Sequence, residues 1–165
     1  MDKRSFLRYW HNVRQLTLKL LEEFPADSFD YRPVPEIMTV SQQFRHILEL
    51  EIYVREGFLT DSWQEPEGLP GSIFEKEMLK DRLRTENERT ISLLSEVPDG
   101  RFIKRVETPY GVLSGELLLL MAVDEEIHHR GNLYTYLRCL GKTPPQMIQT
   151  YHEILKEEGD VPEAL

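Results

Sequence analysis

The sequence predicts an all-α fold, a four-helix bundle with a short extra C-terminal helix. Four long segments carry apolar residues every three or four positions, and no alternating strand pattern competes with them. Helix-capping and helix-ending residues lie at the ends of these segments. Four helices of about twenty residues joined by loops of moderate length favour a bundle. The 165 residues are close to a common domain size of ~150, so we expect a single domain over residues 1–165.

The first helix is predicted from about Ser5 to Phe24, and Pro25 ends it because proline cannot continue the hydrogen-bond ladder. The second helix should begin at Thr39, which forms a capping box with Gln42. Apolar residues follow at helical spacing in both segments. The loop between them, rich in turn-forming residues, separates two helices of similar length.

Ser72 and Glu75 form a second capping box, which predicts a third helix from Ser72 to about Val97. The middle of this helix reads KDRLRTENERT, and its polarity predicts a mostly solvated face. Residues 101–112 after the helix are expected to be extended or to form a short hairpin.

The fourth helix is predicted from Gly115 to Leu140, with Ser114 as its cap and Gly141 as its end. Two prolines at positions 144 and 145 prevent the helix from continuing. A short helix around residues 149–157 completes the expected architecture.

Charge and cysteine content exclude several classes of protein. The chain has 29 acidic and 20 basic residues and a net charge of −9, which disfavours nucleic acid as a partner. Its one cysteine, Cys139, cannot form an intramolecular disulfide, as is usual in a reducing compartment. The longest apolar run, residues 117–123, is far shorter than the ~20 residues of a membrane span. We therefore expect a cytoplasmic protein with no membrane partner.

The apolar face of the fourth helix is interrupted by two polar residues, Glu125 and His129. Following the inward stripe in steps of three and four gives Leu118, Ala122, Glu125, His129, Leu133, Tyr136 and Leu140. A carboxylate that faces a core is costly unless it is paired or bound to a cation. Residues at positions i and i+4 lie one above the other, so this pair could bind one metal ion. A simple ion pair on a solvated face is the alternative.

A third ligand would have to come from another helix, and the candidate is His46 in the middle of the second one. Two imidazoles and one carboxylate suit zinc, nickel or ferrous iron, and three protein ligands leave open positions on the ion. His128 could replace His129 as a ligand or orient one of the ligands. The alternative for His46 is a structural histidine that lies in the core or at its edge and makes its hydrogen bonds within the protein.

Other reactive side chains carry weaker signals. His11 is expected to be exposed or at the rim of the bundle, and His152 lies in the C-terminal segment. Cys139 has no base beside it in the sequence, so we expect a buried and inert thiol.

The segment EEIHHRGNLYTYLRCLGKTPP resembles the last bundle helix of the DinB/YfiT-like family, which reads roughly H-x-x-x-H-R-G-Q and ends in Y-x-x-L-R-x-L-G-x-x-P-P. FDYRPVPEIMTVSQQFRHILELE is similar to the family's loop and ligand-bearing second helix, and TPYGVLSGELLLLMAVDEE to the approach to its last helix. The resemblance covers about residues 29–145, with a gap over the third helix.

This resemblance implies a metal site of three residues, with ligands at His46, Glu125 and His129. Glu125 departs from the family pattern, which has histidine there, and Asn132 stands where glutamine is usual. The additional negative charge of a glutamate ligand would soften the Lewis acidity of the metal. The same substitution is also what a member that has lost catalysis would carry. Arg130 would orient an anionic substrate or form an ion pair on the helix surface.

The resemblance further implies a homodimer that holds a divalent ion and acts on a small-molecule substrate. Relatives include transferases and isomerases that use a low-molecular-weight thiol, and others described as hydrolases. We therefore expect a metal-dependent hydrolase or thiol S-transferase. The alternative is a non-catalytic bundle that binds a metal or small ligand.

Overall fold

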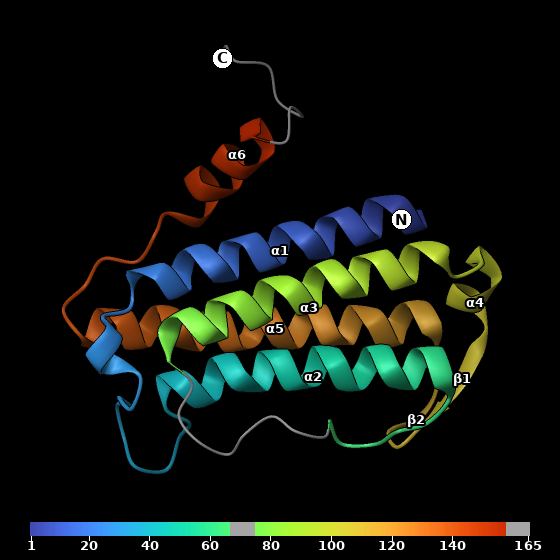
Figure 1. Cartoon of the computed structure of the whole chain (residues 1–165), viewed down its shortest axis with the longest axis horizontal. Coiled ribbons are helices and arrows are strands. Elements are labelled where there is room, and N and C mark those ends of the chain that lie inside the picture. The colour runs from blue at the N-terminus through green and yellow to red at the C-terminus, as the bar shows by residue number, and fades with distance from the viewer. Residues whose placement is uncertain (67–74, 158–165) are drawn as a thin grey trace.

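The computed structural model describes residues 1–66 and 75–157 and confirms the helical bundle (Figure 1). The structure is built from four long helices, together with shorter elements. The long helices are α1 (Lys3–Glu23), α2 (Val40–Thr60), α3 (Lys76–Glu96) and α5 (Gly115–Cys139). The shorter elements are a 3-10 turn η1 (Ala26–Ser28), α4 (Asp99–Ile103), β1 (Arg105–Thr108), β2 (Gly111–Ser114) and α6 (Met147–Glu157).

The four long helices are arranged so that each packs against two others. α1 packs on α3 and α5, and α2 packs on the same two helices. α1 and α5 run in one direction and α2 and α3 in the other, while α6 lies outside the bundle beside α1 (Figure 1). Within the described part of the chain, no helix has the length and apolarity needed to cross a membrane.

Local capping determines where the two helices that carry the candidate site begin. At the start of α2, Gln42 N donates to Thr39 Oγ1 (3.2 Å), while Thr39 N donates to Gln42 Oε1 (2.8 Å). Ser114 caps α5 by accepting from Leu117 N. Gly141 follows the end of α5 with φ of 74°, a left-handed conformation that glycine adopts readily. These signals confirm the predicted starts of both helices.

The segment between the second and fourth helices differs from expectation in two places. α3 begins at Lys76 because Glu75 is extended, so the helix does not include Glu75 as predicted, and the predicted cap Ser72 lies outside the described residues. The chain forms the short helix α4 before the hairpin, which the sequence pattern did not predict. β1 and β2 then pair antiparallel, with Arg105 opposite Ser114, as one of the two expected conformations for this region.

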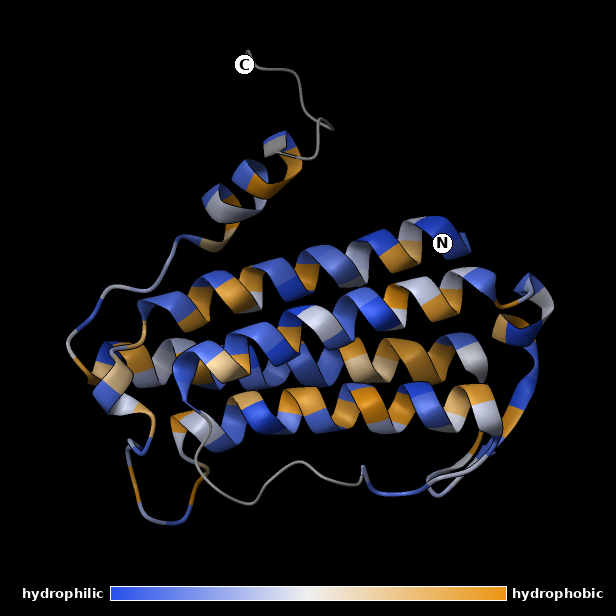
Figure 2. Cartoon of the chain, viewed as in Figure 1, coloured by the Kyte–Doolittle hydropathy of each residue, from blue (hydrophilic) through white to orange (hydrophobic). Residues whose placement is uncertain are grey.

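The hydrophobic core consists of two clusters, one toward each end of the bundle. One cluster surrounds Phe24, Phe44 and Leu137, and the other surrounds Trp10, Phe58 and Leu119. Figure 2 shows the corresponding change along α5, whose first half is hydrophobic and whose middle is hydrophilic. A layer of buried polar side chains lies between the two clusters.

Arg14 of α1 lies at the centre of this polar layer and is fully buried. Its Nε and Nη2 donate to the two carboxylate oxygens of Glu126 in α5, each at 2.9 Å, and its Nη1 donates to Leu83 O of α3 at 2.8 Å. Nη2 also lies 2.8 Å from Glu51 Oε2 of α2. One guanidinium therefore contacts the other three long helices.

A second buried arginine joins α2 to α3. Arg55 Nη1 donates to Glu86 Oε2 at 2.8 Å and to Thr90 Oγ1 at 3.0 Å. Asn87 of the same stretch donates to Glu51 Oε1 at 3.3 Å. Glu86, Asn87 and Thr90 are buried, whereas the other polar residues in the stretch 80–90 are exposed or partly exposed, so the helix has the predicted solvated face and one polar stripe directed into the bundle. The buried residues of this stripe contact the partners that α2 supplies.

The two carboxylates around Arg14 have different electrostatic environments. Burial raises the pKa of Glu51 despite the opposing charge of Arg14, and among the described residues no donor is aligned with its Oε2 for a hydrogen bond. Burial also acts to raise the pKa of Glu126, but Arg14 and the 2.6 Å hydrogen bond from Thr17 outweigh it and lower the pKa. Glu126 is thus the charged partner of Arg14, and Glu51 is the carboxyl that takes up a proton more readily.

Exchanging each carboxylate for its amide tests this assignment. We expect Glu126→Gln to lower the free energy of unfolding at neutral pH by about 3 kcal/mol or more, because it leaves a buried guanidinium poorly compensated. Glu51→Gln should cost less than about 1.5 kcal/mol, since an amide resembles the protonated acid. Urea denaturation of both variants and the wild type measures the difference.

The pH dependence of the same two variants provides the control. Because folding lowers the pKa of Glu126, its ionised carboxylate stabilises the folded protein at pH values above the ordinary pKa of 4.5. This stabilisation is lost as the pH falls through the pKa of the folded state, so Glu126→Gln should reduce the free energy of unfolding by less in acid. Because folding raises the pKa of Glu51, the wild type loses stability as the pH rises through the pKa of the folded state. Above that pH, Glu51→Gln should therefore become more stable relative to the wild type. Equal costs and parallel pH profiles would contradict the assignment.

Candidate metal centre

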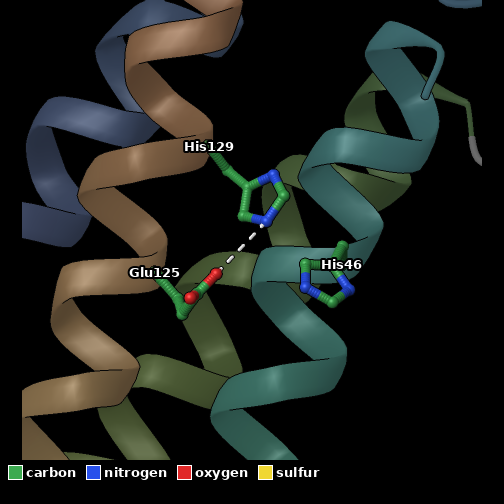
Figure 3. A group of neighbouring side chains, drawn as sticks. All are labelled: His46, Glu125 and His129. Carbon is green, nitrogen blue, oxygen red and sulfur yellow. Dashed lines mark ion pairs between the residues drawn. The ribbon is translucent and has the colours of Figure 1, made fainter. Parts of the chain in front are cut away.

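The structure brings His46, Glu125 and His129 together between α2 and α5. One ligand atom from each residue lies within 4.8 Å of the other two. Figure 3 shows the three side chains directed toward one space, with His46 on α2 and the other two on consecutive turns of α5. The antiparallel packing of α2 on α5 therefore supplies the third side chain that the i,i+4 pair lacks.

The distances are compatible with one ion after small side-chain adjustments. Glu125 Oε2 lies 3.6 Å from His129 Nε2. Ligand atoms on a tetrahedral ion with bonds of about 2.1 Å lie about 3.4 Å apart, so this pair is already close to that geometry. All three ligand atoms lie within 4.8 Å of one another, so the remaining side chain needs to move by no more than roughly 1.5 Å to reach that geometry. Two imidazoles and one carboxylate are also a chemically suitable donor set.

His129 is held by a chain of hydrogen bonds behind the site. Tyr136 Oη donates to Met38 O at 3.0 Å, so its oxygen is free to accept from Gln43 Nε2 at 3.1 Å. This orientation places Gln43 Oε1 against His129 Nδ1 in a short contact. Nδ1 must then carry the proton and donate it to Gln43, which leaves the lone pair of Nε2 directed at the site.

The protonation state of His129 also favours metal binding. Its side chain is buried, and burial lowers its pKa to about 4, assisted by the charge of nearby His46, while Glu125 acts in the opposite direction. The ring of His46 lies 4.5 Å from that of His129 between centroids. At neutral pH His129 is a neutral imidazole, which is the form that can coordinate a cation.

Glu125 lies at the edge of the bundle rather than in its core. Its side chain is 51% exposed, so its place on the inward stripe is wrong, and the neighbouring Glu126 is the buried acid. Arg14 explains the difference, because it draws position 126 inward through a two-point ion pair. Glu125 is therefore solvated in the absence of a cation, and its carboxylate is accessible as a ligand.

The other sequence candidates lie around the site or away from it. His128 is exposed, its Nε2 lies 3.5 Å from Asn132 Nδ2, and its ring lies 5.2 Å from that of His129 between centroids, so it borders the site without being one of the three clustered residues. Arg130 is buried and donates to Val13 O at 2.9 Å, which contradicts a surface ion pair. Cys139 is exposed, so the expectation of a buried thiol is also wrong.

The two remaining histidines, on α1 and α6, are not part of the cluster. His11 is half-buried on α1, where Nδ1 lies 3.2 Å from Asn87 Oδ1 and Nε2 lies 3.2 Å from Gln15 Nε2. His152 of α6 lines a cavity beside α1 and Arg130. Sequence reasoning missed Gln43, whose role depends on Tyr136 at the far end of α5.

Two cavities meet at His46. One, of about 270 Å³, is lined by both His46 and Glu125 and continues between α2 and α5. The other, of about 410 Å³, is bounded by the 32–38 loop and by the start of α2. A small molecule can therefore approach the cluster without passing through the core.

The tautomer of His129 is directly testable by nuclear magnetic resonance. Nitrogen chemical shifts should show a protonated Nδ1 and an unprotonated Nε2 at neutral pH, with an imidazole pKa of about 4 in the metal-free protein. The His129→Gln variant assigns the signal. The opposite tautomer would contradict the orientation deduced from Tyr136 and Gln43.

Comparison with known proteins agrees with this architecture. A model of the DinB family matches residues 1–159. The uncharacterized protein YjoA of Bacillus subtilis is 27% identical over 149 residues, which span 86% of this chain and 93% of YjoA. The crystal structure of YjoA, a DinB-like protein, aligns with a TM-score of 0.73 at 22% identity, covering 87% of this chain and 96% of that one. The chain therefore belongs to the DinB family.

Proposed function

We propose that this DinB-family protein binds one divalent metal ion, zinc, nickel or iron, through His46, Glu125 and His129, and acts on a small molecule. The observation that carries the proposal is the convergence of these side chains from two helices, with Nε2 of a neutral His129 directed at the shared space. Three protein ligands leave coordination positions for a substrate, as in catalytic sites.

The reaction classes we propose are hydrolysis and transfer to a low-molecular-weight thiol. A bound divalent ion supplies a Lewis acid that lowers the pKa of a water or a thiol. His129 and Gln43 keep the site oriented, and Glu125 partly neutralises the cation. The two cavities at His46 provide separate approaches for two reactants.

A non-catalytic metal- or ligand-binding bundle is the second candidate. Glu125 favours it, because the resemblance to DinB/YfiT-like sequences implies histidine at this position. In either case we propose a cytoplasmic homodimer, and sedimentation equilibrium of the purified protein tests its oligomeric state.

Metal content tests the ligand set. Protein purified without chelators or a histidine tag should contain about one equivalent of zinc, nickel or iron by elemental mass spectrometry. His46→Ala and Glu125→Ala should lose it, since either change leaves two ligands. His128→Ala is the matched control, because His128 borders His129 but is not one of the three clustered residues, and this variant should keep its metal. A wild type that stays empty after incubation with these ions would refute the proposal.

Gln43→Leu tests the orienting hydrogen bond. We expect metal affinity to fall by roughly 10- to 100-fold, because His129 loses the acceptor that selects its tautomer. Tyr136→Phe should cause a smaller loss, as it removes only the hydroxyl that orients Gln43. Competition with a chromophoric chelator measures both affinities. Unchanged affinity in Gln43→Leu would show that Gln43 has no positioning role.

Glu125→His separates the two candidate functions. In the metal-loaded protein, a histidine ligand removes one negative charge and should strengthen the Lewis acid. Turnover of activated esters, or of an electrophile with a thiol, that rises in Glu125→His relative to the wild type supports an enzyme. No turnover in either metal-loaded protein favours the non-catalytic bundle.

A further inference from the structure

An apolar groove leads away from the metal-ligand cluster along the space between α2 and α5. It has a volume of about 270 Å³ and begins at His46 and Glu125. Its walls beyond these two residues are apolar, formed by Leu50, Val54, Tyr110, Leu118, Met121 and Ala122. The groove therefore joins the proposed reaction centre to the β1–β2 turn, where Tyr110 lies.

Helical spacing explains why ligands and apolar walls share one face. On α2, Leu50 and Val54 follow His46 at intervals of four residues. On α5, Ala122 and Leu118 precede Glu125 at intervals of three and four. Residues at these spacings lie on the same side of a helix. The two helices that present the ligands in Figure 3 thus continue directly into the groove.

The outer part of the groove exposes apolar surface to solvent. Tyr110 is 66% exposed and Met121 40%, and Leu117, one turn before Met121 on α5, is 46% exposed. Neighbouring large apolar side chains that remain in water are a common sign of a binding site. Their continuity with the ligand cluster distinguishes them from isolated exposed residues elsewhere.

The charges of the groove select against anions. Among the described residues, no lysine or arginine lines the groove, and Glu125 is the only acidic residue that does. The chain as a whole carries −9. The cavity on the other side of His46 differs, because Arg32 and Arg45 line it together with two glutamates. An anionic group would therefore be disfavoured in the groove between α2 and α5.

We propose that this groove binds the uncharged, apolar part of the substrate and places an adjoining polar group at the metal ligands. The inference rests on the proposed function and names the substrate class, a neutral small molecule with an apolar arm. An apolar cavity of about 150 Å³ can hold benzene. A groove of about 270 Å³ accommodates one ring or a short alkyl chain.

A series of neutral alkyl hydroxamates tests the proposal on the zinc-loaded protein. The hydroxamate head binds the metal, and the tail grows from acetyl through butanoyl to hexanoyl. Isothermal titration calorimetry should show affinity rising about two- to fourfold per added methylene as the tail is buried. An affinity independent of tail length would overturn the groove as the apolar subsite.

Two matched variants test whether the alkyl tail of the hydroxamate lies in the groove. Met121→Gln puts a polar side chain of similar length in the wall, and it should reduce the gain per methylene while leaving acetohydroxamate affinity nearly unchanged. Met78→Gln, at a comparably exposed methionine on α3, should behave like the wild type. The same chain-length dependence in Met121→Gln as in the wild type would overturn the assignment.

A probe without a metal-binding group separates this inference from the metal proposal. Hexanol added to metal-free protein should shift the methyl resonances of Met121 and Ala122 and leave that of Met78 in place. Those shifts would support the groove even if no metal were ever bound. Their absence would overturn it even if metal binding were established.

Discussion

The buried ion pair between Arg14 and Glu126 is the constraint on which the rest of the bundle depends. A guanidinium buried in a core is tolerable only when nearly all its donors are matched, and here α5, α3 and α2 supply the partners. This requirement limits how the long helices can rotate or slide relative to one another. The polar layer also divides the apolar core into two clusters, and each cluster packs separately at one end of the bundle.

The candidate site depends on the orientation that this layer imposes on α5. With Glu126 directed inward to Arg14, the preceding Glu125 lies at the boundary of α2 and α5, one turn from His129. Adjacent glutamates thereby take different roles, one as a buried counterion and one as an accessible carboxylate. The chain from Met38 through Tyr136 and Gln43 then sets which nitrogen of His129 faces the site.

The chemistry available at the site follows from its charge and its surroundings. A carboxylate in place of a third imidazole gives the proposed centre one more negative charge, which weakens a Lewis acid but retains the cation. The apolar groove on one side and the mixed-charge cavity on the other distinguish two approaches. Together they give the ligand cluster two approaches of different polarity.

The sequence alone determined the helical class, the caps at Thr39 and Ser114, and the three side chains that meet between α2 and α5. These features depend on neighbours within a few residues, or on a resemblance carried by contiguous motifs. Only the tertiary structure decided that Glu126 rather than Glu125 is buried, that three polar residues of α3 (Glu86, Asn87 and Thr90) face inward, and that Gln43 orients His129. Each of these depends on a partner in another helix, and Arg14 and Glu126 lie 112 residues apart in the chain. Hydrophobic periodicity does not identify such partners, because it describes the spacing of residues along one helix and not the side chains they meet on another.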